Sequence, residues 1–146
     1  MKILFVEDDE FKFQQVNDFL VHKFSPVQIF RGKSVTSGIR LLDEGSYDLV
    51  LLDMSLPTYD TGRQKPQAFG GRNLLRYIDG LDSQPPAIVV TQLETFGEGE
   101  SLIDIHTLRG QLLEEHGEYL KGLVYYNSRS EAWQQELTSI IEQSGH

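Results

Sequence analysis

Carboxylate side chains follow two apolar runs of the sequence, and their type and position are those of groups that do chemistry. Asp53 ends the run Leu49–Asp53. The acidic stretch Glu7–Glu10 follows the run Lys2–Val6. Short apolar runs of this kind are typical of strands buried in a parallel sheet, whose carboxyl ends meet at one edge. The sequence therefore predicts an acidic pocket that needs a cation and in which one carboxylate can act as a nucleophile.

The elements that must position this pocket alternate between strand and helix patterns. The expected strands cover residues 2–6, 27–30, 48–52, 87–91 and 123–126, and an apolar stripe at helical spacing follows each of them. Ser34 is an expected N-cap, and Asp8 or Asp9 could cap the first helix. Capping boxes that begin at Ser101 and Ser128 are expected to open the last two helices. Five strands alternating with five helices predict an α/β fold with a doubly wound parallel sheet covered on both faces.

Composition limits the class of protein further. The 146 residues are 39% apolar with a formal charge of −9, and no apolar run approaches the ~20 residues of a membrane span. A strongly negative surface repels phosphate backbones, which argues against nucleic-acid binding. The chain has no cysteine, which excludes disulfides and is typical of a reducing compartment. Because the first expected strand begins at Lys2, we expect no signal peptide, no membrane partner and a cytoplasmic location.

Two segments are longer than an alternating fold requires. Residues 58–70 form a polar loop between the third expected strand and its helix, where about 2–6 residues are usual. Residues 92–122 are long for one helix and two turns. Because extra length at the carboxyl edge of a sheet often carries function, both segments are candidate binding surfaces. We expect residues 1–146 to form one domain that contains them.

These residues resemble the receiver domain of bacterial two-component response regulators. The resemblance is carried by Glu7–Asp9 after the first strand, by Asp53 followed four residues later by Pro57, and by Thr91 at the end of the fourth strand. It covers the whole chain apart from the two long segments. It implies a flavodoxin-like (βα)5 fold and a single-domain response regulator of phosphorelay signalling that is not itself an enzyme.

The resemblance also implies a role for each residue of the pocket. Asp53 is the expected phosphoacceptor, which takes its phosphoryl group from a sensor histidine kinase or a phosphotransfer protein. The expected ligands of Mg²⁺ are oxygens of Glu7, Asp8 and Asp53 and the backbone carbonyl of Ser55. Thr91 is expected to bond a phosphoryl oxygen and to draw its loop inward as the switch.

One position departs from the family pattern. Receivers end their fifth strand with a lysine that contacts the phosphoryl group, whereas Tyr126 falls at this position here and Asn127 is the next-best register. A tyrosine donates a hydrogen bond but carries no positive charge, which removes part of the electrostatic stabilisation. A loop cation is one hypothetical substitute. The candidates are Arg63, Lys65, Arg72 and Arg129.

Two other functions compete with an active receiver. A pseudo-receiver would signal by protein contact alone, without phosphorylation, through the two long segments. A phosphatase of the haloacid dehalogenase type also uses a strand-end aspartate, but it needs a second aspartate two residues later, where this chain has Ser55.

Since we expect no attached output domain, the signal is expected to leave through a downstream protein. The face formed by the helix of the 92–122 region, the strand Leu123–Tyr126 and the last helix carries such contacts in the family. A homodimer is a further candidate assembly.

Overall fold

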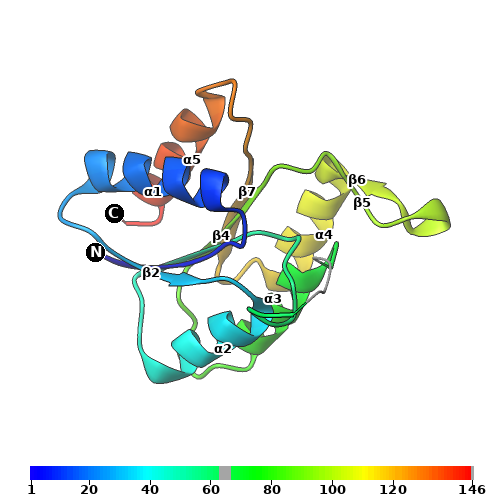
Figure 1. The fold of residues 1–146 in the computed structure, drawn as a ribbon, viewed down its shortest axis with the longest axis horizontal. Coiled ribbons are helices and arrows are strands. Elements are labelled where there is room, and N and C mark those ends of the chain that lie inside the picture. The colour runs from blue at the N-terminus through cyan, green and yellow to red at the C-terminus, as the bar shows by residue number, and fades with distance from the viewer. Residues whose placement is uncertain (63–66, 146) are drawn as a thin grey trace.

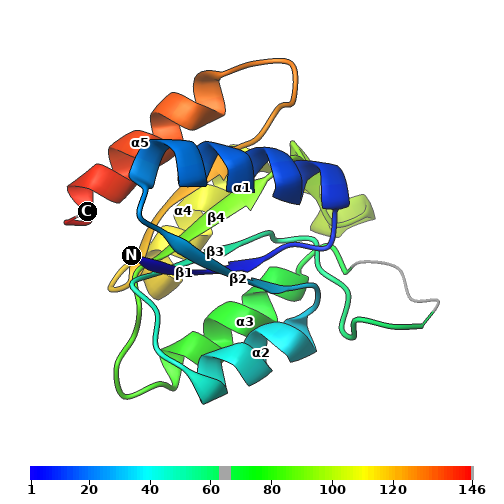
Figure 2. The same cartoon turned by 60° about the vertical axis from the view of Figure 1, so that its left-hand side comes forward.

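A parallel five-stranded sheet in the order β2-β1-β3-β4-β7 forms the centre of the molecule (Figures 1 and 2). The computed structural model describes residues 1–62 and 67–145. The strands of this sheet are β1 (Lys2–Val6), β2 (Gln28–Gly32), β3 (Leu49–Leu52), β4 (Ala87–Thr91) and β7 (Leu120–Tyr125). This is the flavodoxin-like order. Strand β2 is added on one side of β1 and the later strands on the other side, so the direction in which strands are added changes between β1 and β3. The predicted fold class is confirmed.

Helices cover both faces of the sheet, as Figure 2 shows. Helices α1 (Glu10–Phe24) and α5 (Ala132–Gln143) lie on one face, and their apolar side chains form one core cluster with strand residues such as Phe5 and Val90. The other face carries α2 (Val35–Glu44), α3 (Gly70–Asp79) and α4 (Ile105–His116) over a second cluster. Strands β1, β3 and β4 are buried on both faces, which explains why their sequences are continuous apolar runs.

Two expected helix starts are wrong. The box that begins at Ser101 does not open α4, because residues Gly99–Ser101 form a 3-10 turn. Helix α4 instead begins after Asp104, whose carboxylate accepts the Thr107 N–H at 2.8 Å. Helix α5 likewise begins at Ala132 without the cap expected from Ser128. In both places the chain forms a short turn before the helix. The Ser101 hydroxyl donates to the Glu98 carbonyl at 2.6 Å within the first turn, and the Ser130 N–H donates to the Asn127 carbonyl at 3.1 Å to close the second. By contrast, Ser34 caps α2 as predicted, in a reciprocal box with Ser37.

Part of the long 92–122 segment folds as a hairpin outside the main sheet. Strands β5 (Thr95–Phe96) and β6 (Ile103–Asp104) pair in antiparallel fashion and project beside α4 (Figure 1). Phe96 is buried against the α4 side of the core, whereas Leu102 at the end of the hairpin is 51% exposed. The hairpin therefore lengthens the α4 face without adding a strand to the central sheet. The other long segment, 58–70, includes residues 63–66, which lie outside the described part of the chain.

Two glycines allow α3 to begin directly against the end of β3. A Cβ added at Gly71 would lie 2.5 Å from the backbone oxygen of Asp53, and one at Gly70 would lie 2.4 Å from the oxygen of Leu56. The Gly71 N–H also donates to the Met54 carbonyl at 2.8 Å. The helix start thus fixes the backbone that carries Asp53.

We expect Gly71→Ala to displace this backbone and to lower the free energy of unfolding by about 1–3 kcal/mol. The added Cβ would clash with main-chain atoms, which cannot avoid it by changing a side-chain rotamer. Urea unfolding measures the change. Gly110→Ala is the matched control, since an added Cβ there meets nothing within 4 Å. Equal stability of the two variants would show that the loop after β3 adapts freely.

Among the described residues, no helix combines the length and the apolar character that crossing a membrane requires.

Candidate functional site

The carboxyl edge of β1 and β3 brings the predicted acidic residues together. The two strands pair in parallel register, so Glu7 and Asp53 follow them side by side, and the Asp53 N–H donates to the Val6 carbonyl at 3.2 Å. Glu7, Asp8 and Asp53 each offer one oxygen within 4.8 Å of the others. Glu7 and Asp53 are buried and Asp8 is half-buried. These are the side chains for which the sequence predicted a common pocket.

The turn that carries Glu7 is fixed by its neighbours. Asp9 is the N-cap of α1 and accepts the Lys12 N–H at 2.8 Å, so the capping role falls to Asp9 and not to Asp8. From β2, the Arg31 guanidinium donates to the Glu7 carbonyl at 3.1 and 3.2 Å and pairs with Glu10. Asp8 is therefore not the cap of α1, and its carboxylate belongs to the acidic cluster.

A lysine that the sequence analysis did not single out reaches into this pocket. The Lys12 ammonium lies 2.6 Å from Glu7 Oε1, 3.2 Å from Asp53 Oδ2 and 2.7 Å from the Val90 carbonyl, to which it donates. Its side chain is only 1% exposed. The contacts of the ammonium with Glu7 and Asp53 are buried ion pairs. Lys12 belongs to the first turn of α1, so the helix on one face of the sheet supplies a cation to the strand ends.

Burial is the main influence on the two acidic residues after β1. It raises the pKa of Glu7 to about 7, although the Lys12 ammonium opposes the shift; Asp53 adds to it. Burial also raises the pKa of Asp8, with a smaller contribution from Asp53. Lys12 alone therefore does not balance the crowded carboxylates, and the pocket favours an additional positive charge or a proton.

The other predicted site residues lie around the same edge. Thr91 is fully buried at the end of β4, where its hydroxyl accepts the Leu93 N–H at 3.3 Å and its carbonyl accepts the Tyr126 N–H at 2.7 Å. Tyr126 follows β7 and faces the α1 side, with its hydroxyl donating to Gln15. Ser55 is half-buried in the turn after Asp53. The roles implied for these residues stay predictions.

The proposed loop cations lie differently. The Arg72 guanidinium donates to Gln111 at 2.7 Å and lies over the Phe69 ring, so its described contacts are with α4 and the start of α3. Arg129 lines a hollow at the carboxyl edge together with Tyr126 and Asn127. Arg63 and Lys65 lie outside the described residues. Within the described chain, the cation that touches Asp53 comes from α1.

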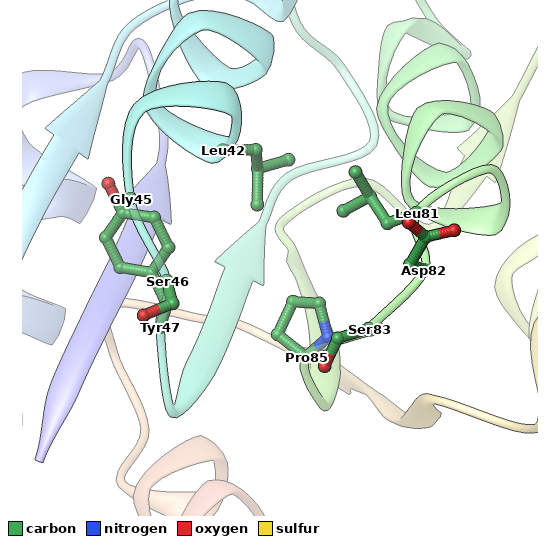
Figure 3. A pocket seen from close by; sticks show the side chains of 8 residues that line it. All are labelled: Leu42, Gly45, Ser46, Tyr47, Leu81, Asp82, Ser83 and Pro85. Carbon is green, nitrogen blue, oxygen red and sulfur yellow. The ribbon is translucent and has the colours of Figure 1, made fainter.

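A second hollow lies at the opposite edge of the sheet, before β3 and β4 (Figure 3). Its lining residues are Leu42, Gly45, Ser46, Tyr47, Leu81, Asp82, Ser83 and Pro85. Asp82 is the one carboxylate among them, so this hollow lacks the convergent charges of the acidic pocket.

Together, the strand order and the acidic edge define the class: the chain has the receiver fold of response regulators. It is 29% identical over 147 residues to the Detocs response regulatory protein DtcB of Enterobacter cloacae, covering 97% of this chain and 98% of that protein. It is also 25% identical over 138 residues to the uncharacterized protein y4jR of Sinorhizobium fredii, covering 91% of each. No family model matches the chain.

Solved structures agree with this class at the level of the fold. The isolated receiver domain of RcsB from Salmonella enterica serovar Typhimurium, in the presence of the phosphomimetic BeF3⁻, matches with a TM-score of 0.67 at 15% identity, covering 97% of this chain and 88% of that one. The phosphorylated cyanobacterial phytochrome response regulator RcpA matches with a TM-score of 0.63 at 15% identity, covering 95% and 87%.

Proposed function

We propose that the chain is a single-domain receiver that accepts a phosphoryl group on Asp53. The observation that carries the proposal is the convergence of three carboxylates within 4.8 Å at the edge where β1 and β3 end, with Asp53 at the end of β3. In doubly wound sheets this edge is the position where ligands bind. The receiver fold supports the same function.

The two oxygens of Asp53 have different contacts: Oδ2 lies 3.2 Å from the Lys12 ammonium, whereas Oδ1 is bonded to the backbone. Oδ1 accepts the Met54 N–H at 2.7 Å, which orients the carboxylate and leaves Oδ2 as the nucleophile. In the transfer, Oδ2 forms a bond to phosphorus while the P–N bond of a phosphohistidine breaks and its electron pair returns to the imidazole. Thr91, at the end of the neighbouring strand β4, is the hydroxyl that we assign to a phosphoryl oxygen.

The acidic residues fit Mg²⁺. Glu7 Oε1 is buried and is paired with the Lys12 ammonium at 2.6 Å, yet the raised pKa values of Glu7 and Asp8 indicate that the negative charge of the cluster is under-compensated. Oxygens of Glu7, Asp8 and Asp53 and the Ser55 carbonyl would hold the ion. When bound, Mg²⁺ supplies positive charge that stabilises the transferring phosphoryl group.

The proposal includes partners on two faces. A sensor histidine kinase or phosphotransfer protein would deliver phosphate at the carboxyl edge in the cytoplasm, and the chain would act as an acceptor and not as an enzyme. A downstream protein would bind the face of α4, β7 and α5, which the β5–β6 hairpin extends (Figure 1). The exposed Leu102 on this hairpin supports that assignment.

Intact-mass measurement tests the phosphoacceptor. Incubation with Mg²⁺ and acetyl phosphate is expected to add one phosphoryl group to the protein, and Asp53→Asn is expected to abolish the adduct because an amide is not a nucleophile. Asp60→Asn is a control for the loss of an aspartate after the same strand, since Asp60 accepts a hydrogen bond from Ser34 and does not belong to the acidic cluster. An adduct that persists in Asp53→Asn would place the phosphate elsewhere.

A second function is favoured by one observation. Lys12 already contacts both Glu7 and Asp53, which would suit a phosphorylation-independent pseudo-receiver whose pocket is closed by an internal ion pair. This alternative expects no adduct in the wild-type protein under conditions that label an ordinary receiver, together with partner binding that is unchanged in Asp53→Asn.

A further inference from the structure

We propose that Lys12 supplies the positive charge that contacts the phosphoryl group on Asp53, in place of the lysine expected at the end of the last sheet strand. The inference rests on the proposed function, because it needs Asp53 to be phosphorylated. It assigns this contact to a residue of α1, a part of the chain that the sequence pattern does not connect with phosphate.

The position of the ammonium supports this assignment. Lys12 Nζ lies 3.2 Å from Asp53 Oδ2, the oxygen that is not occupied by the Met54 N–H and that would bond to phosphorus. The Val90 carbonyl, at 2.7 Å, holds the ammonium at the end of β4, next to Thr91. A cation fixed at this point is already positioned where negative charge accumulates, so little reorganisation is needed during transfer.

The neighbouring tyrosine explains why the charge comes from the helix. The ring of Tyr126 lies 6.0 Å from Lys12 Nζ, so the residue at the expected lysine position packs beside the ammonium. Its hydroxyl donates to Gln15, also on α1, and is therefore engaged away from the carboxylates. Tyr126 and Lys12 together occupy the region where a strand-end lysine would extend, with the tyrosine filling the volume and the lysine supplying the charge.

Charge balance is consistent with this exchange. Three clustered carboxylates and one ammonium leave two negative charges, which one divalent cation neutralises. Lys12 therefore does not replace Mg²⁺ in the pocket. It replaces the second, monovalent charge that a strand-end lysine provides.

The labelling rate with acetyl phosphate and Mg²⁺ tests this role. In this reaction Asp53 Oδ2 bonds to phosphorus, and acetate leaves with the electron pair of the broken P–O bond, so no proton has to move. Lys12→Met is expected to slow labelling at least about tenfold, because a fixed charge at the reacting group is lost. Lys12→Gln, which keeps a donor for the Val90 carbonyl, is expected to show the same loss while preserving the fold. Circular dichroism checks folding, and Lys121→Met controls for the loss of an exposed lysine on β7.

The decisive variant moves the charge back to the strand. The double variant Lys12→Met with Tyr126→Lys is expected to recover most of the rate, which a merely structural role for Lys12 would not produce. If the wild-type protein is labelled and both Lys12 variants are labelled at the same rate or faster, the inference is overturned. The assignment of Asp53 as the phosphoacceptor would then remain. A wild-type protein that takes no phosphate would overturn the proposed function itself.

Discussion

Lys12→Met is expected to lower the free energy of unfolding at pH 8 by about 3–5 kcal/mol, which is the usual cost of removing one partner from a buried ion pair. The side chain of Lys12 is 1% exposed, and its ammonium is close to both Glu7 and Asp53. Without it, two buried carboxylates lose their nearest positive charge, and the Val90 carbonyl loses its donor. The methionine fills the volume of the lysine stem, so the loss is electrostatic and does not come from a cavity.

Urea unfolding without Mg²⁺, followed by the fluorescence of Trp133, measures this loss. Trp133 is buried against Phe19 and Tyr126, so its emission reports the integrity of the α1–α5 side of the core. In an Asp53→Asn background, the loss in the free energy of unfolding caused by Lys12→Met is expected to be smaller by about 0.5–3 kcal/mol. One of the two buried carboxylates that lose their cation is already absent there. Lys121→Met, an exposed substitution, is expected to stay within about 0.5 kcal/mol of wild type.

The outcome that contradicts this prediction is a Lys12 variant as stable as Lys121→Met. Additive effects of Lys12→Met and Asp53→Asn would also contradict it, because residues in direct contact are expected to couple.

The fold could be predicted because the signals that determine it are local. Strands buried on both faces must be apolar throughout, so β1, β3 and β4 are evident as runs, and the acidic residues that follow them converge because parallel strands end at one edge. The starts of α4 and α5 could not be placed in the same way. At Ser101 and Ser128 the spacing of a capping box is present, but whether a turn or a helix forms there depends on contacts such as the β5–β6 pairing.

Lys12 shows why the site was incomplete in the sequence. Its spacing to Val16 and Leu20 places it on the face of α1 that packs against the sheet, where a charged side chain is costly unless it is paired. A lysine on the buried face of a helix, one turn after an acidic cluster, was the available signal. One partner of that lysine, Glu7, is nearby in sequence, but the other, Asp53, is far away, and only the packing of α1 across β1 and β3 brings Lys12 and Asp53 together.

Without Mg²⁺, the free energy of unfolding of the wild-type protein is expected to fall between pH 5 and pH 8 by about 3 kcal/mol more than that of Glu7→Gln. In the folded protein, burial raises the pKa of Glu7 from 4.5 to about 7. Between these values the folded state binds more protons than the unfolded state, so stability falls as pH rises and the loss is complete once the pH exceeds the folded pKa. Glutamine resembles the protonated carboxyl and does not titrate, so the two proteins should be similar near pH 5 and diverge above it.

Urea unfolding at several pH values measures this difference, with Glu118→Gln as the matched control because Glu118 is an exposed glutamate. Equal pH dependence in wild type and Glu7→Gln would contradict the prediction. Adding Mg²⁺ extends the test to the proposed ion site. An ion that binds the ionised form of Glu7 stabilises the folded state by mass action, so Mg²⁺ should restore more stability at pH 8 than at pH 5. In Glu7→Gln this difference between the two pH values should become smaller, because one of the proposed oxygen ligands no longer carries a charge that depends on pH.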